Sequence, residues 1–314
     1  MDMPRLASET GVSSRWPSMP RKFDQASEIQ GLDYHPTQPG MDVEIFSVSE
    51  LRRRVGAKSL RHTCRYTFHL LLCVTRGKCT QMVDFERVRC APGSLLILRP
   101  GQVHHLGRSL DWDGWMVLFR PEFLCSRDLQ DGAGIRLEGL RGPLVLTDEE
   151  MHAVTEAIAR MRKDSERTAP STDLAALLRH QLHALLWRLL VASENKKPSG
   201  SHAASSPRFH AFQQLVEMHY VSWRHVSTYA RRLGCSDKTL ARTVAEATGM
   251  GAKAFIASRV CLEAKRLLTH TGHPVTEISA QLGFDEPTNF IKFFRREVGF
   301  TPIDFRKKQL RFWK

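Results

Sequence analysis

The C-terminal third of the chain holds two short groups of side chains that are suited to hydrogen-bonding nucleic acid. The positions are Lys238, Thr239 and Arg242 in the first group and Thr288, Asn289, Lys292 and Arg296 in the second. Hydroxyl, amide, ammonium and guanidinium groups bind base edges and phosphates in a major groove. Each group is interleaved with an apolar pair four residues apart, Leu240 with Val244 and Phe290 with Phe294. On a helix, this spacing places the apolar pair on one face and the polar side chains on another.

The residues before each group complete a repeated helix-turn-helix pattern. A short helix is expected within 226–234 and again within 275–283, and each ends at a glycine, Gly234 or Gly283. Glycine adopts the left-handed conformation that ends a helix without a Cβ clash. The segment 252–270 between the units has the length of a helix. Two units of one kind favour DNA binding over the alternative, an ordinary helical domain whose basic faces are merely solvated.

Residues 207–308 resemble the C-terminal DNA-binding domain of the AraC/XylS family of transcription regulators. The resemblance rests on Leu-Gly-Cys-Ser at 233–236, Thr-Gly at 248–249, the segment 259–268, Val-Thr-Glu-Ile at 275–278, Gly-Phe at 283–284, Phe-Phe-Arg-Arg-Glu at 293–297, Gly-Phe-Thr-Pro at 299–302 and Phe-Arg at 305–306. In this family each recognition helix enters a major groove, and the two grooves lie on one side of the duplex. The base-facing positions implied by the resemblance are Lys238, Thr239, Ala241 and Arg242, then Pro287, Thr288, Asn289 and Lys292.

Three positions depart from the family pattern. Ala241 and Ala245 stand where longer polar side chains are common, so we expect the first recognition helix to read fewer bases. Pro287 stands where a polar side chain is common, which places that contact in doubt.

The charge of the chain agrees with a polyanionic partner. The chain has 314 residues with 46 Lys and Arg against 33 Asp and Glu, a net charge of +13, and nine of these charges lie within 207–314. This concentration of positive charge favours double-stranded DNA as the partner. A membrane surface is the alternative for a basic helix, but no apolar run has the length of a bilayer span. Residues 1–20 lack a signal-peptide pattern, so we expect a cytoplasmic protein with no membrane association.

The seven cysteines are scattered and include no Cys-x-x-Cys pair. An odd, dispersed set suits reduced, buried thiols better than a disulfide framework or a zinc site. It also argues against a DNA-repair alkyl-acceptor protein, which requires a reactive cysteine held by zinc.

Residues 66–119 have the rhythm of short strands separated by glycine and proline. The expected strands are 66–74, 79–85, 88–90, 95–98, 103–106 and 112–119. This rhythm predicts an antiparallel barrel or sandwich. The run Pro-Gly-Ser-Leu-Leu-Ile-Leu-Arg-Pro-Gly-Gln-Val-His at 92–104 resembles the cupin-type sensor domain of the same regulator family. We therefore expect an α+β chain of two domains, with an N-terminal cupin-like barrel and helical hairpin followed by an all-α double helix-turn-helix domain.

The predicted limits are a disordered segment at 1–22, a sensor and dimerisation domain at 23–194, a linker at 195–206 and the DNA-binding domain at 207–314. The linker is assigned from its Lys, Pro, Gly and Ser composition.

The histidines of the barrel raise the question of a metal. His104 and His105 follow the second Pro-Gly turn, where a metal-binding cupin has a ligand. Such a site also needs a closely spaced histidine pair and a carboxylate on the earlier strands, which the run after His69 lacks. We therefore expect no metal and no cofactor, and a cavity for one small effector instead. Its predicted wall residues, which depend on strand parity, are Tyr66, Phe68, His69, Arg99, His104 and Trp115.

Two helices are expected at about 148–163 and 173–192. Thr147 and Glu150 form a Thr-x-x-Glu capping box at the start of the first helix. In the second, Leu178, Leu182, Leu185 and Leu189 follow the 4-3-4 spacing of a coiled-coil seam. The seam either packs on the barrel or forms a dimer contact. Because the whole apolar stripe is wider than one intramolecular contact needs, we predict a homodimer.

Catalytic motifs are missing from the sequence, which has no nucleophile elbow, phosphate loop or dinucleotide fingerprint. We therefore expect a sequence-specific transcription regulator, not an enzyme, that is controlled by a small-molecule effector. RNA polymerase is a further expected partner. The alternatives are a ligand-independent regulator whose barrel serves only dimerisation, a nucleoid-type DNA binder, and a cupin enzyme with a DNA-binding tail.

Overall fold

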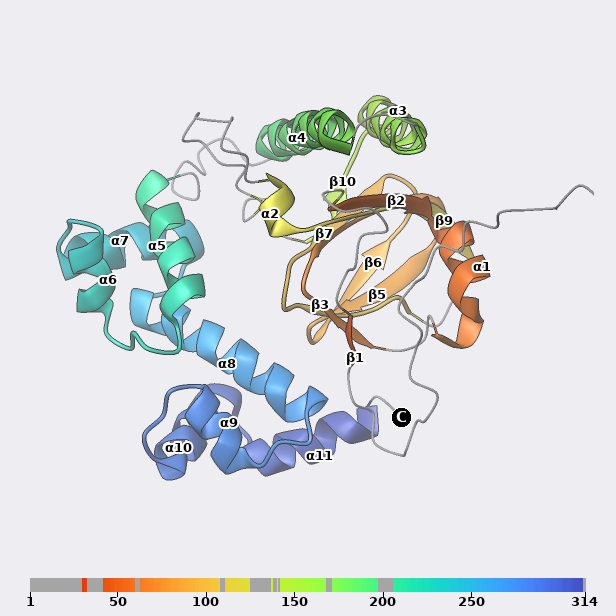
Figure 1. The fold of residues 1–314 in the computed structure, drawn as a ribbon. Helices are drawn as coiled ribbons and strands as arrows, with labels where there is room; N and C mark the ends of the chain where they lie inside the picture. Colours follow the sequence, from red (N-terminus) through yellow and green to blue (C-terminus); the bar gives the residue numbers. More distant parts are fainter. Residues whose placement is uncertain are drawn as a thin grey trace, which may run out of the picture.

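The computed structural model describes residues 30–32, 42–59, 63–107, 111–124, 137, 140, 142–167, 171–196 and 206–312. The predicted disordered segment 1–22 and most of the predicted linker lie outside the described residues. A barrel covered by helices occupies the N-terminal part, and a helical domain lies beside it (Figure 1).

Within the described residues, the barrel consists of two five-stranded sheets. The first has the order β1 (Gln30–Leu32), β3 (Cys64–Tyr66), β8 (Val103–His105), β5 (Cys79–Val83) and β6 (Glu86–Cys90). The second has the order β10 (Leu144–Val145), β7 (Ser94–Leu98), β4 (His69–Gly77), β9 (Trp112–Phe119) and β2 (Val43–Ser47). Of the described strand pairs, β1 with β3 is parallel and the others are antiparallel.

The second sheet is buried on both faces, which explains why β4 is apolar without alternation. Leu70 and Leu72 point into the barrel, where they pack with side chains of the first sheet. Leu71 and Cys73 point the other way, into a core shared with the helices that cover the sheet. The barrel therefore has one core inside and another between its second sheet and the helices.

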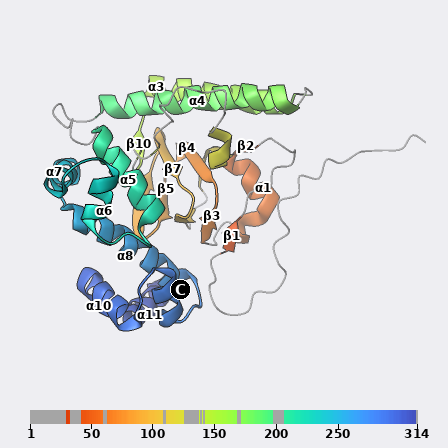
Figure 2. The ribbon, with the colours of Figure 1, turned by 60° about the vertical axis from the view of Figure 1, so that its left-hand side comes forward.

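Among its described residues, this domain has the helices α1 (Val48–Ser59), α2 (Pro121–Leu124), α3 (Asp148–Ser165) and α4 (Ser171–Asn195). Helices α3 and α4 lie across the barrel as a separate layer (Figure 2). The predicted capping box is confirmed, because the Thr147 side chain accepts a hydrogen bond from the Glu150 N–H and the Glu150 carboxylate accepts one from the Thr147 N–H.

The predicted dimer seam on α4 requires a correction. Leu178, Leu182, Leu185 and Leu189 are at most 1% exposed and belong to the core between α4 and the second sheet. Because these side chains are already buried within the chain, they leave no surface for a second copy.

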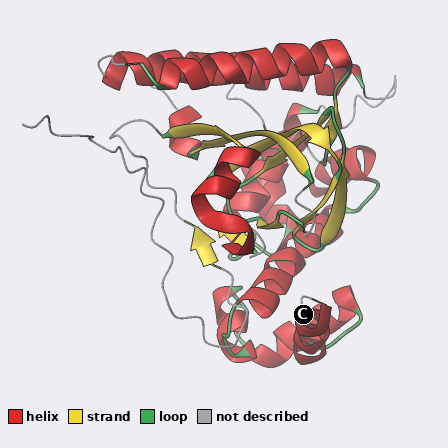
Figure 3. Cartoon of the chain, turned by 90° about the vertical axis from the view of Figure 1, so that its right-hand side faces the viewer, coloured by secondary structure: helices red, strands yellow, loops and turns green. Residues whose placement is uncertain are grey.

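The helical domain has two units joined by one long helix. The first unit comprises α5 (Pro207–His219), α6 (Val226–Arg232) and α7 (Asp237–Thr248), and the second comprises α9 (Val275–Gln281), α10 (Pro287–Val298) and α11 (Pro302–Phe312). Helix α8 (Ala252–His270) connects them and contributes to both apolar cores. Figure 3 shows the strands confined to the N-terminal domain. The predicted fold class is therefore confirmed.

Candidate nucleic-acid interface

Helix α7 presents the first group of polar side chains. Ser236 caps the helix by accepting a hydrogen bond from the Thr239 N–H at 3.1 Å. Leu240 and Val244 are fully buried in the core of the first unit. This burial fixes the rotation of α7. As a result Lys238 and Arg242 are exposed, with the partly exposed Thr239 and Ala241 beside them.

Helix α10 presents the second group in the same manner. Phe290 and Phe294 are fully buried in the core of the second unit. The side chains left exposed on the helix include Thr288, Asn289, Lys292 and Arg296. Pro287 is the first residue of α10, where a missing N–H has no consequence and the fixed φ favours the helix. Its departure from the family pattern therefore has a structural reason.

The charges on these two faces are only weakly engaged within the protein. Arg242 lies 3.9 Å from Glu246, in a pair whose side chains are both more than half exposed. Exposed pairs of this kind contribute about 0–1 kcal/mol. Arg296 pairs with Glu297 at 2.6 Å, and its own side chain is 65% exposed. Both guanidinium groups are therefore accessible to a phosphate or a base. Their contact with DNA stays a prediction.

Other basic residues of this domain hold the two units in place. The Arg224 guanidinium lies 4.3 Å from the centre of the Phe284 ring and donates to the Leu282 carbonyl oxygen. Arg306 donates to the carbonyl oxygens of Leu268, at 2.9 Å, and His273, at 2.6 Å. In the sequence, the basic tail that starts at Arg306 is compatible either with a phosphate contact or with a solvated end. In the structure, Arg306 instead binds the carbonyl groups of Leu268, near the end of α8, and of His273, after it. No local pattern in the sequence signals either contact.

The barrel interior holds three of the predicted wall residues. Tyr66, Phe68 and His104 are buried there. The His104 Nδ1 lies 3.4 Å from the Tyr66 hydroxyl, and its Nε2 lies 2.9 Å from Oε1 of Gln81. Burial lowers the pKa of His104 to about 3, so the imidazole is neutral. Gln81, which the sequence does not single out, thus forms a polar row with Tyr66 and His104 beside the apolar side chains of the inner core.

The other three predicted wall residues lie on the opposite face of the second sheet. The His69 ring stacks on Phe119 at 5.0 Å, and Arg99 donates to the Leu137 carbonyl oxygen at 3.0 Å. Trp115 packs against the same helix-covered core. The prediction that they line the interior is wrong, because side chains alternate along a strand and a one-residue error reverses the face.

Two further observations concern the described ranges. In these parts of the chain, no three His, Cys, Asp or Glu side chains gather as a metal site would require. None of the helices described there has the length and apolar character needed to cross a membrane.

Comparisons with known proteins match both halves of the chain to one family. A model described as an AraC-like ligand binding domain matches residues 58–212, and a helix-turn-helix domain model matches residues 229–308. The chain belongs to the AraC family. It is a DNA-binding transcription regulator with a ligand-binding-like N-terminal domain, in a family that is not enzymatic.

Individual relatives extend over both domains. The arabinose operon regulatory protein of Salmonella typhimurium (strain LT2) is 23% identical over 242 residues, which cover 76% of this chain and 83% of that protein. The HTH-type transcriptional activator RhaS of Escherichia fergusonii is 23% identical over 287 residues, 90% of this chain and 97% of that protein. Among solved structures, ToxT from Vibrio cholerae matches 84% of this chain and 97% of its own, with 11% identity and a TM-score of 0.39.

Proposed function

We propose that this AraC family member is a homodimeric, sequence-specific regulator whose α7 and α10 enter successive major grooves of its operator. The observation that carries the proposal is the matched arrangement of the two helices. Each buries an i, i+4 apolar pair and exposes a basic side chain from the opposite face, Arg242 or Lys292. Such side chains can contact both bases and phosphates. RNA polymerase stays a predicted partner, and 23–194 and 207–314 stay the proposed domain limits.

We further propose that a small molecule binds inside the barrel. The row Tyr66, His104 and Gln81 supports this, because small-molecule sites are mostly apolar and contain a few polar groups that orient the ligand. A ligand with a hydroxyl, amide or carboxylate group would replace some of these hydrogen bonds. Its apolar part would contact Phe68 and the leucines of the second sheet.

The dimer contact is proposed on the outer face of α4. Leu177, Trp187 and Val191 are 38%, 44% and 58% exposed, on the side opposite the buried leucines. His180 and Ala184 are also exposed and complete a 3-4-3-4 spacing from 177 to 191. This is the heptad spacing of helices that pack along a seam. A second copy of α4 would cover this stripe.

The deciding experiment is selection of bound sequences from a library of genomic fragments by the purified full-length chain, followed by footprinting. A regulator should select few sites and protect adjacent major-groove turns on one side of the duplex. Equal recovery of all fragments would indicate a nucleoid-type binder and refute the proposal. A thermal-shift screen of metabolites on the same protein tests the effector, since a ligand raises the melting temperature when it binds only the folded state. Selective DNA binding without any stabilising metabolite would favour the ligand-independent alternative.

A further inference from the structure

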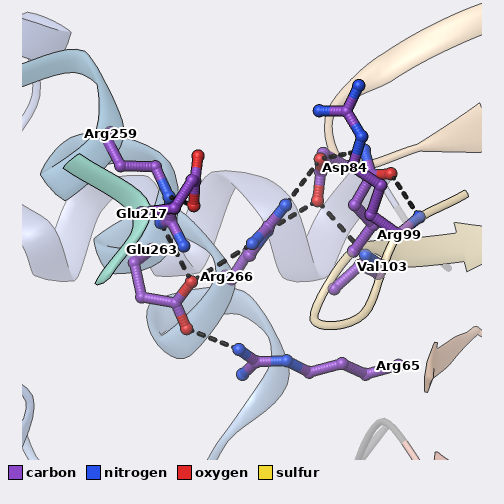
Figure 4. A network of polar contacts seen from close by, with 9 residues as sticks. Arg65, Asp84, Arg99, Val103, Glu217, Arg259, Glu263 and Arg266 are labelled. Carbon is purple, nitrogen blue, oxygen red and sulfur yellow. Dashed lines mark hydrogen bonds and ion pairs between the residues drawn. The ribbon is translucent and has the colours of Figure 1, made fainter. Parts of the chain in front are cut away.

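The turn between β5 and β6 connects the barrel to the DNA-binding domain (Figure 4). Nε of Arg266 on α8 donates to Oδ1 of Asp84 at 2.7 Å, and its Nη2 donates to Oδ2 at 2.9 Å. Both residues are buried. Burial raises the pKa of the Asp84 carboxyl, but the hydrogen bonds and charge of Arg266 outweigh that effect and leave the pKa below its ordinary value. The pair is thus a charged, bidentate contact between two domains.

The backbone at Asp84 indicates that its side chain is needed there. Val83 pairs with Glu86, so Asp84 and Phe85 form a two-residue hairpin turn, and Asp84 has φ 54°. Glycine adopts this region with less strain than any residue that has a Cβ. Among the described residues, Asp84 is the one position other than glycine with a positive φ. Its carboxylate also accepts hydrogen bonds from the Val103 N–H and from the Gln102 side chain, each at 3.2 Å.

A second ion pair crosses the same junction. Glu263, one turn before Arg266 on α8, accepts from Arg65 of β3 at 2.6 Å. Glu263 also accepts from Arg266 at 3.2 Å and from Arg259 at 3.3 Å. Arg259 in turn binds Glu217 of α5 at 2.7 Å, as Figure 4 shows. The network therefore extends from the barrel along α8 to the first helix of the DNA-binding domain.

Phe85 adds an apolar contact beside the ion pair. Its ring stacks on His270, with centroids 6.0 Å apart, and meets Phe305 edge to face at 5.9 Å. Phe305 belongs to the core of the second unit. The core of the first unit, as far as the structure describes it, contains no barrel residue. The barrel therefore holds α8 and the second unit.

The junction also lies next to the polar row inside the barrel. Val103, which donates to Asp84, precedes His104 on β8, and Val83 pairs with His104 across the sheet. A ligand that displaces Gln81 or His104 from its partner would act on β5, which leads into the turn with Asp84, or on β8, which contacts that turn through Val103. By contrast, Arg242 and Lys292 are exposed in the docked arrangement. The junction is thus placed to position the recognition helices and does not cover them.

We propose that Asp84 and Arg266, with Phe85, form an interdomain latch through which the barrel positions α8 and transmits its occupancy to the DNA-binding domain. The transmission of occupancy rests on the proposed function, whereas the existence of the latch does not. Holding the domains in one arrangement removes part of the ordering cost when DNA binds. Releasing the latch is therefore expected to lower operator affinity.

Hydrogen–deuterium exchange of the full-length chain tests the latch without DNA. Asp84→Asn keeps a residue that tolerates positive φ but removes the charge, and Arg266→Gln removes the other partner. Each variant should raise amide exchange at least tenfold in 263–270 and 84–86 and leave β4 and β9 unchanged. The double variant should exchange no faster than the faster single variant, because residues acting through one contact are non-additive. Glu217→Gln is the matched control, since it breaks a pair of the same network within one domain.

Three exchange results would overturn the latch. These are unchanged exchange at 263–270, additive effects in the double variant, or an equal rise throughout β4 and β9, which would mean that Asp84 only stabilises the barrel. The positioning role is tested on a selected operator, where both single variants should bind at least fivefold more weakly with unchanged affinity for random DNA. Because the two substitutions change the net charge in opposite directions, a loss of operator affinity in both variants cannot come from the change in net charge. Unchanged operator affinity in both variants would overturn the role of the latch in positioning the recognition helices. Failure to select any operator would refute the proposed function and leave the exchange result standing.

Discussion

Gly283 packs against the carbonyl group of Val221, whereas a Cβ on Gly234, its counterpart in the first unit, would have no heavy atom within 4 Å apart from those of its own local segment. Both glycines have positive φ, 72° and 62°. The turns of the two helix-turn-helix units therefore have the same backbone conformation at the glycine. Only in the second unit does this turn contact a segment of the other unit. The repeat is equivalent in conformation and not in packing.

Substitution of each glycine by alanine should reveal this difference. Gly234→Ala should lower the free energy of unfolding by about 1–2 kcal/mol, the cost of a Cβ in the left-handed region. Gly283→Ala should cost clearly more, because its Cβ would overlap the Val221 carbonyl oxygen and force the two units apart. Urea unfolding of the full-length variants measures both. Equal losses would show that the contact between the units relaxes easily.

The recognition helices should contribute separately to base preference. Arg242→Ala and Lys292→Ala should each weaken binding to a selected operator by about 1–3 kcal/mol and relax preference in one half of the site. Arg160→Ala, which removes an exposed charge from α3, is the matched control. Footprints and competition with mutated sites measure the effect. If both variants discriminate every base as the unmodified chain does, these side chains do not read the sequence.

Local periodicity was enough to predict the two units and the strand-rich domain. The pairs Leu240 with Val244 and Phe290 with Phe294 mark the buried faces of α7 and α10 without any knowledge of the tertiary structure. The capping box at Thr147 is also a local signal. In each case the residues that decide the structure lie within one helical turn of one another.

The wrong predictions concern elements that are apolar on more than one face, so that composition does not show which face a side chain occupies. The apolar run in β4 is buried on both faces, so nothing in its composition indicated that His69 points toward the helices. On α4 the buried leucines and the exposed Leu177, Trp187 and Val191 are all apolar, and only the position of the barrel decides which of them is covered. The pair Asp84 and Arg266 is separated by 182 positions and has no periodic signature.

The two faces of α4 should respond differently to charge. Leu182→Glu would place a carboxylate in a dry core, which costs several kcal/mol, so this variant should unfold. Trp187→Glu and Val191→Glu alter exposed positions and should leave the fold intact but convert the dimer to a monomer. Circular dichroism and sedimentation velocity distinguish these results. A folded, dimeric Trp187→Glu, Val191→Glu double variant would exclude the outer face of α4 as the dimer contact.

The stability of the protein at acidic pH should depend on the neutral imidazole of His104 inside the barrel. Burial lowers the pKa of His104 to about 3, against an ordinary value of 6.5. Between these values the unfolded chain binds a proton that the folded chain excludes, so stability rises with pH and is lost as the pH falls below about 6.5. At pH 5.5, one unit below the pKa of the unfolded chain, one such group lowers the free energy of unfolding by about 1.4 kcal/mol. Burial also lowers the pKa of His69, to about 4, and of His270, to about 3.

His104→Gln removes one of these three titrations and keeps an amide that can hydrogen-bond Gln81. The loss of unfolding free energy between pH 7.5 and pH 5.5 should therefore be smaller in the variant by about 1.4 kcal/mol. Between pH 7.5 and pH 8.5 the imidazole is neutral in both the folded and the unfolded chain, so the difference between variant and unmodified protein should stay constant there. Urea titrations at the three pH values measure these quantities. An equal acid loss in both proteins would mean that the folded barrel admits the proton, for instance through water that reaches His104.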